Sequence, residues 1–284
     1  MEYTPSRFVA LLSAWLAALG LTLLSACHGE SAPNADSSPT GNSDSVGVPT
    51  YTYRVANIYP HDPEAFTQGL VYAGGRLYEG TGLYGQSSLR EVELETGRVL
   101  RERRLEAAYF GEGIALVSDR VFQLTYRSRR GFVYRLDDFA TLADFGYTTE
   151  GWGLAWDGQR LIMSDGSASL SFRDPGSFAE TGRVEVRYSG GDLRNLNELE
   201  CIGGEVWANI WQTDLIARIA PQTGQVVAWV DLAGLLTASE RSRADVLNGI
   251  AADAATGRIF VTGKLWPWLF EIEPVLPRAG RGKG

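Results

Sequence analysis

The segment QGLVYAGGRLYEGTG, residues 68–82, decides the fold because related segments recur four more times along the chain. Each copy has a polar or aromatic residue, then glycine (glutamate in the fourth copy) and an aliphatic residue, followed by a turn and a second β-type run. The other copies are EGIALVSDRVFQLTY from Glu112, WGLAWDGQRLIMSDG from Trp152, NELECIGGEVWANIW from Asn197 and NGIAADAATGRIFVTGK from Asn248. Their first residues are 44, 40, 45 and 51 positions apart. Such a period, with short strands, is typical of β-propeller blades.

Five copies predict an all-β fold, a five-bladed β-propeller. Thr-Gly pairs in ETGRV from Glu95 and from Glu180, and in QTGQV from Gln222, indicate hairpin turns after the third strand of three copies. The last copy supplies only three strands before about residue 274, whereas residues 51–58 alternate like a strand without a partner. We therefore expect this N-terminal strand to complete the last blade and close the ring, which removes two open sheet edges. A sandwich or barrel of similar length is the alternative. Residues 232–246 are expected to be a short helix or a long loop.

The N-terminal 26 residues are predicted to lie outside the fold. Residues 8–26 are apolar, follow Arg7 and end in small residues immediately before Cys27, which indicates a secretory signal. The junction resembles a bacterial lipobox, and this resemblance implies cleavage before Cys27 and lipidation of its sulfur. An uncleaved membrane helix is the alternative, since the stretch is nearly long enough to span. His28, and no aspartate, follows Cys27, which favours a periplasmic lipoprotein anchored in the outer membrane.

The predicted domain organisation has four parts. Residues 1–26 form the signal peptide, and residues 27–50 form the lipidated cysteine and a polar, flexible tether that cannot bury enough apolar surface to fold. Residues 51–276 form the propeller, and residues 277–284 a disordered tail. The membrane is thus contacted through the lipid anchor only, and we expect a monomer.

Composition excludes several classes of partner and cofactor. The chain has 26 Lys and Arg against 34 Asp and Glu, so nucleic acid is not an expected partner. With Cys27 lipidated, Cys201 has no disulfide partner and is expected to be a small buried residue. The two histidines, His28 and His61, cannot build a zinc site of the usual kind, and no G-x-S-x-G motif accompanies them. We expect no metal and no cofactor. Asp165, Asp214 and Glu198 could hold calcium, but no regular loop spacing supports this.

The repeats also predict where a functional site lies. In a propeller the first strand of every blade lines the central channel, so equivalent positions of the five copies converge. The residues before the common glycine are Gln68, Glu112, Trp152, Asn197 and Asn248. The residues five positions past the start of each second strand are Gly82, Tyr126, Gly166, Trp211 and Lys264. Glu112, within FGEGI at 110–114, would then lie among carboxamides, aromatics and an ammonium group. A structural channel is more often filled with Val, Ser or Thr, so we interpret this ring as a functional site.

Eight short motifs carry a resemblance to a known family. They are FTQGL (66–70), YFGEGI (109–114), QLTY (123–126), GWGL (151–154), LNELE (196–200), ANIW (208–211), LNGIA (247–251) and VTGKLWP (261–267). In this order they resemble the plant and bacterial glutamine cyclotransferases, the glutaminyl-peptide cyclotransferases. The resemblance extends over residues 51–274. It implies a five-bladed propeller that converts N-terminal glutamine of peptides or proteins to pyroglutamate with release of ammonia and without zinc.

The resemblance also implies roles for individual residues. Glu112 is the expected catalytic carboxylate and proton shuttle, with Asn197 and Lys264 as further catalytic residues. Lys264 could stabilise an oxyanion or orient Glu112, and the sequence leaves both roles open. The expected substrate-binding residues are Gln68, Phe66, Phe110, Tyr126, Trp152 and Trp211, to which the ring position adds Asn248. Tyr126 departs from the tryptophan common in the family, which affects the shape of the pocket. The alternative function is a non-catalytic propeller lipoprotein that binds peptides or an envelope protein.

Overall fold

The structure of the protein is a computed structural model, and residues 47–277 are described. The expectations for the signal peptide, for Cys27, for most of the tether and for the tail from residue 278 onward concern residues outside this range. Within residues 47–277, no helix is long and apolar enough to cross a membrane.

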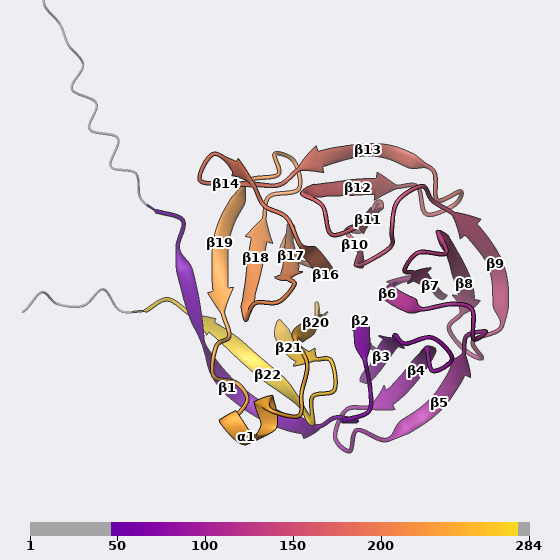
Figure 1. The fold of residues 1–284 in the computed structure, drawn as a ribbon, viewed down its shortest axis with the longest axis horizontal. Helices are drawn as coiled ribbons and strands as arrows, with labels where there is room; N and C mark the ends of the chain where they lie inside the picture. Colours follow the sequence, from indigo (N-terminus) through magenta and orange to yellow (C-terminus); the bar gives the residue numbers. More distant parts are fainter. Residues whose placement is uncertain (1–46, 278–284) are drawn as a thin grey trace, which may run out of the picture. The chain divides into compact units, whose positions relative to one another are not determined.

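The strands form four-stranded antiparallel units arranged around a central axis (Figure 1). Three units are separate sheets, and an eight-stranded sheet contains two more that are joined through β1, so the all-β propeller expected from the repeats is confirmed. In each unit the strand that begins a repeat lies nearest the axis. The units are β2 (Thr67–Ala73), β3 (Arg76–Thr81), β4 (Ser88–Glu93) and β5 (Val99–Arg104); β6 (Gly111–Val117), β7 (Arg120–Thr125), β8 (Arg130–Arg135) and β9 (Thr141–Gly146); β10 (Leu154–Trp156), β11 (Leu161–Met163), β12 (Ser169–Arg173) and β13 (Glu180–Glu185); β16 (Leu196–Ile202), β17 (Glu205–Ile210), β18 (Leu215–Ile219) and β19 (Val226–Asp231); and β20 (Leu247–Asp253), β21 (Arg258–Gly263), β22 (Trp268–Val275) and β1 (Thr50–Pro60).

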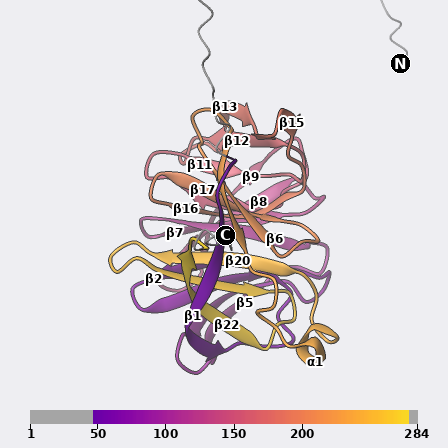
Figure 2. The ribbon, with the colours of Figure 1, turned by 90° about the vertical axis from the view of Figure 1, so that its left-hand side faces the viewer.

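The N-terminal strand closes the ring as predicted. β1 pairs antiparallel with β22 from Thr52 opposite Val275 to Pro60 opposite Trp268 (Figure 2). It also pairs in parallel with β19 of the neighbouring unit, where Thr50 lies opposite Trp229. Upstream of β1, Val48 packs against the core that the third and fourth units share. Packing contacts therefore begin a few residues before the boundary expected at residue 51.

The turn predictions are correct for two of the three Thr-Gly pairs. Residues 95–98 connect β4 to β5, and residues 222–225 connect β18 to β19. The prediction at Glu180 is wrong, because residues 180–184 lie inside β13 and pair with β12. The turn occurs earlier, at residues 174–177, where one carboxylate oxygen of Asp174 accepts hydrogen bonds from the backbone N–H groups of Gly176 and Ser177. This Asp-Pro-Gly-Ser sequence forms a turn through its own side chain.

Two shorter features complete the fold. A small hairpin of β14 (Arg187–Tyr188) and β15 (Gly191–Asp192), which the repeats do not predict, links the third unit to the fourth. The segment 232–246 is a loop with one helical turn, α1 (Ala238–Arg241), which confirms the expected short helix or loop. Thr237 and Glu240 cap that turn reciprocally, as in a capping box.

The inner strands approach one another closely, which explains the glycine after Glu112. The backbone N–H of Gly113 donates a 2.8 Å hydrogen bond to the carbonyl oxygen of Trp152 in the next unit. A Cβ atom on Gly113 would lie 2.6 Å from that same oxygen, so no larger residue fits. The backbone of FGEGI therefore packs directly against the neighbouring unit, and Glu112 is fixed beside the axis.

Candidate active site

A cavity of about 330 Å³ opens at one end of the central channel. Its volume is within the usual range for small-molecule sites. Nine of the ten residues predicted to catalyse or to bind substrate line this cavity, and Asn248 does not. The lining consists of Phe66, Gln68, Phe110, Glu112, Tyr126, Trp152, Asn197, Trp211, Gln212, Asp245, Val246 and Lys264. Positions up to 198 residues apart in the chain are thus brought together.

Two carboxyl groups line this cavity, the exposed one of Asp245 and the buried one of Glu112. Glu112 is only 4% exposed. One of its carboxylate oxygens accepts a 3.1 Å hydrogen bond from Nε2 of Gln68. Burial raises the pKa of Glu112 well above its ordinary value, while the positive charge of Lys264 acts in the opposite direction. A carboxyl group with a raised pKa keeps its proton to a higher pH than a free glutamate does, which suits a group that both accepts and donates a proton.

Asn248 orients Gln68 from behind the cavity wall. Its side-chain nitrogen donates hydrogen bonds to Oε1 of Gln68 at 3.2 Å and to the carbonyl oxygen of Thr67 at 2.9 Å. Because Oε1 of Gln68 faces this donor, Nε2 of Gln68 faces Glu112. The ring position predicts that Asn248 contacts the substrate. In the structure its carboxamide instead points into the interior, where it binds Thr67 and Gln68.

Lys264 and Asn197 present polar groups that no neighbouring side chain occupies. The ammonium nitrogen of Lys264 lies 4.9 Å from the centroid of the Phe66 ring, and within residues 47–277 it forms neither a salt bridge nor a hydrogen bond. Burial lowers the pKa of Lys264, which the charges of Glu112 and Asp245 partly oppose. Asn197 is buried in β16, and its backbone carbonyl, not its carboxamide, accepts a 2.7 Å hydrogen bond from Ser164. Both groups are therefore available to a ligand.

The aromatic residues form the walls of the cavity. Edge-to-face contacts join Phe66 to Phe110, with ring centroids 6.0 Å apart, and Trp152 to Trp211, at 5.6 Å. Tyr126 packs against Phe110 at 5.8 Å. The ring position occupied by Gly82 leaves room for this wall, because a Cβ atom there would lie 2.4 Å from the Phe110 ring. The polar residues between these walls, Gln68, Glu112, Asn197 and Lys264, are buried, which strengthens electrostatic interactions there.

The structure adds rim residues that the repeats do not predict. Gln212, Asp245 and Val246 line the cavity from connecting segments whose sequences differ between the copies. Glu150, just before GWGL, accepts hydrogen bonds from the indole nitrogen of Trp152 at 3.1 Å and from Nε of Arg127 at 3.0 Å. The other end of the Arg127 guanidinium donates to the hydroxyl of Tyr126 at 3.0 Å. Two aromatic walls from neighbouring units are thus connected through Glu150.

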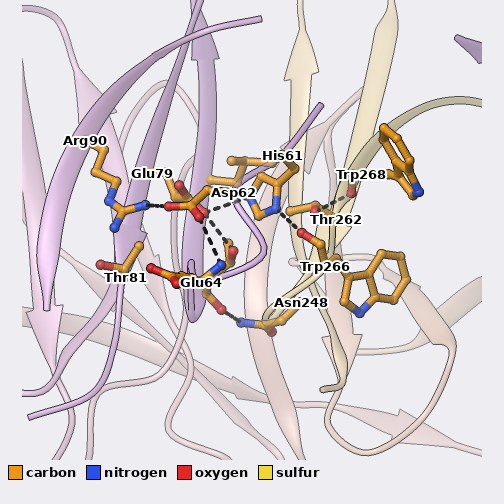
Figure 3. A network of polar contacts seen from close by, with 12 residues as sticks. His61, Asp62, Glu64, Glu79, Thr81, Arg90, Asn248, Thr262, Trp266 and Trp268 are labelled. Atoms are coloured by element: carbon orange, nitrogen blue, oxygen red, sulfur yellow. Dashed lines mark hydrogen bonds and ion pairs between the residues drawn. The ribbon is translucent and has the colours of Figure 1, made fainter. Parts of the chain in front are cut away.

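A buried ion pair fixes the seam between the first and last units (Figure 3). Nε2 of His61 lies 3.0 Å from a carboxylate oxygen of Glu79, and its Nδ1 lies 2.7 Å from the carbonyl oxygen of Trp266. Burial alone would lower the pKa of His61, but the charge of Glu79 raises it above its ordinary value. Glu79 also accepts a 2.7 Å hydrogen bond from Thr67, the residue before Gln68. In the part of the chain that the structure describes, no group of three or more His, Cys, Asp or Glu could hold a metal ion.

Three comparisons with known proteins agree with this geometry. The sequence model of the glutamine cyclotransferase family matches residues 23–274. A glutaminyl-peptide cyclotransferase of Arabidopsis thaliana is 48% identical over 221 residues, which are 76% of this chain and 69% of the relative. The crystal structure of a glutaminyl cyclase from Myxococcus xanthus superimposes with a TM-score of 0.74 at 38% identity, covering 81% of this chain and 99% of that one.

Proposed function

This chain belongs to the glutamine cyclotransferase family, and we propose that it is a glutaminyl-peptide cyclotransferase that converts N-terminal glutamine to pyroglutamate. The observation that carries the proposal is the buried Glu112, which holds one hydrogen bond from Gln68 and faces an aromatic-walled cavity. The substrate is a peptide or protein with N-terminal glutamine.

In the proposed reaction, the α-amine of the substrate attacks the carbon of its own side-chain amide. A bond forms between the amine nitrogen and this carbon, Glu112 accepts the proton released from the amine, and the oxygen of the amide becomes an oxyanion. Glu112 then returns the proton to the amide nitrogen, the oxyanion collapses to the carbonyl group of the new ring, the bond from this carbon to the amide nitrogen breaks, and ammonia leaves. Both reacting groups belong to one residue, so the protein needs mainly to fold the side chain back.

The remaining polar groups fit the charges that develop. Lys264 carries no hydrogen bond to Glu112 among the described residues, and this supports a role towards the oxyanion. The carboxamides of Gln68 and Asn197 can hold the substrate amide and the first peptide carbonyl. A site that hydrogen-bonds an amide discriminates strongly against side chains that lack one, because its buried polar groups would remain unpaired.

The test is release of ammonia from a peptide with N-terminal glutamine, with the same peptide starting in asparagine as the control. We expect release from the glutamine peptide, also in the presence of a chelator, and none from the asparagine peptide. Folded protein that binds the glutamine peptide but releases no ammonia over hours would instead be a non-catalytic peptide-binding propeller.

We further propose that Cys27 carries the lipid that anchors a monomeric protein to the periplasmic face of the outer membrane. The apolar stretch of residues 8–26, the small residues before Cys27 and the polar tether support this. Replacement of Cys27 by serine should move the protein from the membrane fraction to the soluble fraction, and light scattering of the soluble form measures its oligomeric state.

A further inference from the structure

Tyr84 extends the aromatic wall of the cavity to the outer surface. Its side chain is among the exposed large hydrophobic ones, with the residue 55% exposed. Its ring packs edge-to-face on Phe110, with centroids 5.4 Å apart and an interplanar angle of 76°. Because Phe110 lines the cavity and also contacts Phe66, an aromatic surface runs without a break from the cavity to solvent on this side.

The loop that carries Tyr84 is fixed to the cavity wall. The carbonyl oxygen of Leu83 accepts hydrogen bonds from the backbone N–H groups of Gln86 and Ser87, at 3.0 and 2.9 Å. The hydroxyl of Ser87 accepts a 2.9 Å hydrogen bond from the N–H of Gly111, the residue after Phe110. Leu83 has a φ of 78°, a conformation uncommon for a residue with a branched side chain. A strained but well-anchored turn thus holds Tyr84 beside Phe110, so little further ordering is needed to bind a ligand.

The opposite side of the rim is polar. There the exposed residues are Gln212 and Asp245. A glutamine whose side chain and amine lie at Glu112 continues through its carbonyl group into a second residue, which covalent geometry places about 3.8 Å further along the chain, at the mouth. The aromatic lining residues are only partly exposed, whereas Tyr84, which packs on Phe110, is well exposed. The apolar surface available to a side chain at this second position therefore extends furthest into solvent on the side of Tyr84.

Building on the proposed cyclotransferase function, we propose that Tyr84 and the outer edge of Phe110 form a subsite for the side chain of the second residue of the substrate. This subsite favours an aromatic or large aliphatic side chain over glycine. Tyrosine suits the role, since its large ring has only two rotatable side-chain bonds and its hydroxyl can stay in water.

The test compares two peptide amides, Gln-Phe-Ala and Gln-Gly-Ala, as substrates of the wild type and of the Tyr84→Ala variant. We expect the ratio of kcat/KM values, phenylalanine over glycine, to fall roughly three- to tenfold in the variant, the size of one aromatic contact. Tyr84→Phe should keep the wild-type ratio. The matched control is Tyr188→Ala, which removes another exposed tyrosine that packs edge-to-face on Trp229 at 5.1 Å, outside the cavity lining.

An unchanged ratio in Tyr84→Ala, whether both values fall together or neither falls, would overturn the subsite. Equal losses would show that Tyr84 only supports Phe110. Calorimetric binding of the two peptides to Glu112→Gln and to Glu112→Gln/Tyr84→Ala separates this proposal from the function. If the wild type releases no ammonia while the preference in binding still depends on Tyr84, the subsite stands and the cyclotransferase function falls.

Discussion

Glu112 and Glu198 are two carboxyl groups on inner strands of the propeller, and only one of them faces a cavity. Their residues are 4% and 1% exposed, and burial raises the pKa of both well above the ordinary value. The two oxygens of Glu198 accept hydrogen bonds from the backbone N–H groups of Leu70 and Ile250, at 3.2 and 2.8 Å. Glu112 accepts one hydrogen bond, from Gln68. A shifted pKa therefore does not distinguish a reactive carboxyl group from a structural one, whereas free acceptor sites beside a cavity do.

The position of Glu198 explains its structural role. It replaces the glycine that the other four copies have after the first ring residue. From β16 its side chain reaches backbone groups of β2 and of β20, so one carboxyl group connects three inner strands. The glutamate that departs from the repeat pattern in the fourth copy, Glu198, thus links inner strands across the channel by hydrogen bonds.

The largest effect is expected for Glu112→Gln. An amide cannot shuttle the proton, so kcat should fall by about 10²–10⁴-fold, while peptide binding and the melting temperature remain near the wild-type values. Steady-state ammonia release, calorimetric binding and thermal unfolding measure the three quantities. Turnover within threefold of the wild type would remove Glu112 from the mechanism.

Glu79 is a third buried carboxylate and differs from Glu112 and Glu198 because it forms an ion pair, with His61. His61→Gln should lower the free energy of unfolding by about 3–5 kcal/mol, as expected when a buried pair loses one partner. The raised pKa of His61 contributes stability that is complete below 6.5 and is lost as pH rises through the folded-state value. The lowered pKa of Glu79 contributes stability that is complete above 4.5 and is lost at lower pH.

The difference between wild type and His61→Gln should therefore be largest between pH 4.5 and 6.5 and should shrink at alkaline pH. Urea unfolding across this range measures it. The matched control is Arg54→Gln, which removes the exposed pair with Glu273 and should change stability by about 1 kcal/mol or less. A difference that does not vary with pH would contradict an ionised pair at His61.

A smaller effect, and on stability alone, is expected for Glu198→Gln. An amide oxygen can accept one of the two backbone hydrogen bonds, but its NH₂ group faces the other N–H, which should cost about 1–3 kcal/mol. Because Glu198 does not line the cavity, kcat/KM of the folded protein should stay close to that of the wild type. Chemical denaturation measures the predicted loss of stability, and ammonia release tests whether kcat/KM is unchanged. A large loss of activity without a loss of stability would reverse the roles assigned to the two carboxyl groups.

The smallest effect is expected for Glu150→Gln and appears in the pH profile. Burial is the main reason for the raised pKa of Glu112, and the negative charge of Glu150 raises it further. Without that charge the pKa of Glu112 falls, so the acid limb of kcat/KM should move to lower pH, while glutamine can still accept the hydrogen bond from Trp152. Glu180→Gln, on the outer strand β13, is the control. A shift to higher pH would contradict the assignment of the acid limb to Glu112.

The repeats predicted the fold because the spacing of inner strands fixes the blade architecture. Alternation in residues 51–58 predicted the closing strand, but it could not reveal the second pairing of β1 with β19, since alternation does not identify a partner. The turn at Glu180 was mispredicted because Asp174 forms a turn a few residues earlier. Local turn chemistry overrode the repeat pattern there.

The site was predicted to the extent that it lies on the repeated strands. Equivalent positions brought Glu112, Gln68 and Asn197 together, but equivalence does not give the direction of a side chain, and Asn248 turns towards Thr67. Gln212, Asp245 and Glu150 lie in loops that differ between the copies. No period in the sequence therefore pointed to them.

The double pairing of β1 has a mechanical consequence for a protein held at Cys27, as proposed above. Any pull on the tether reaches the ring through β1, which is bound to β19 on one side and to β22 on the other. A load along β1 is shared by the run of pairs from Thr52–Val275 to Pro60–Trp268 rather than by one pair at a time. The strand that closes the ring is thus also the element that carries this load, and it ends at Pro60, next to His61, whose ion pair with Glu79 supports the wall of the cavity.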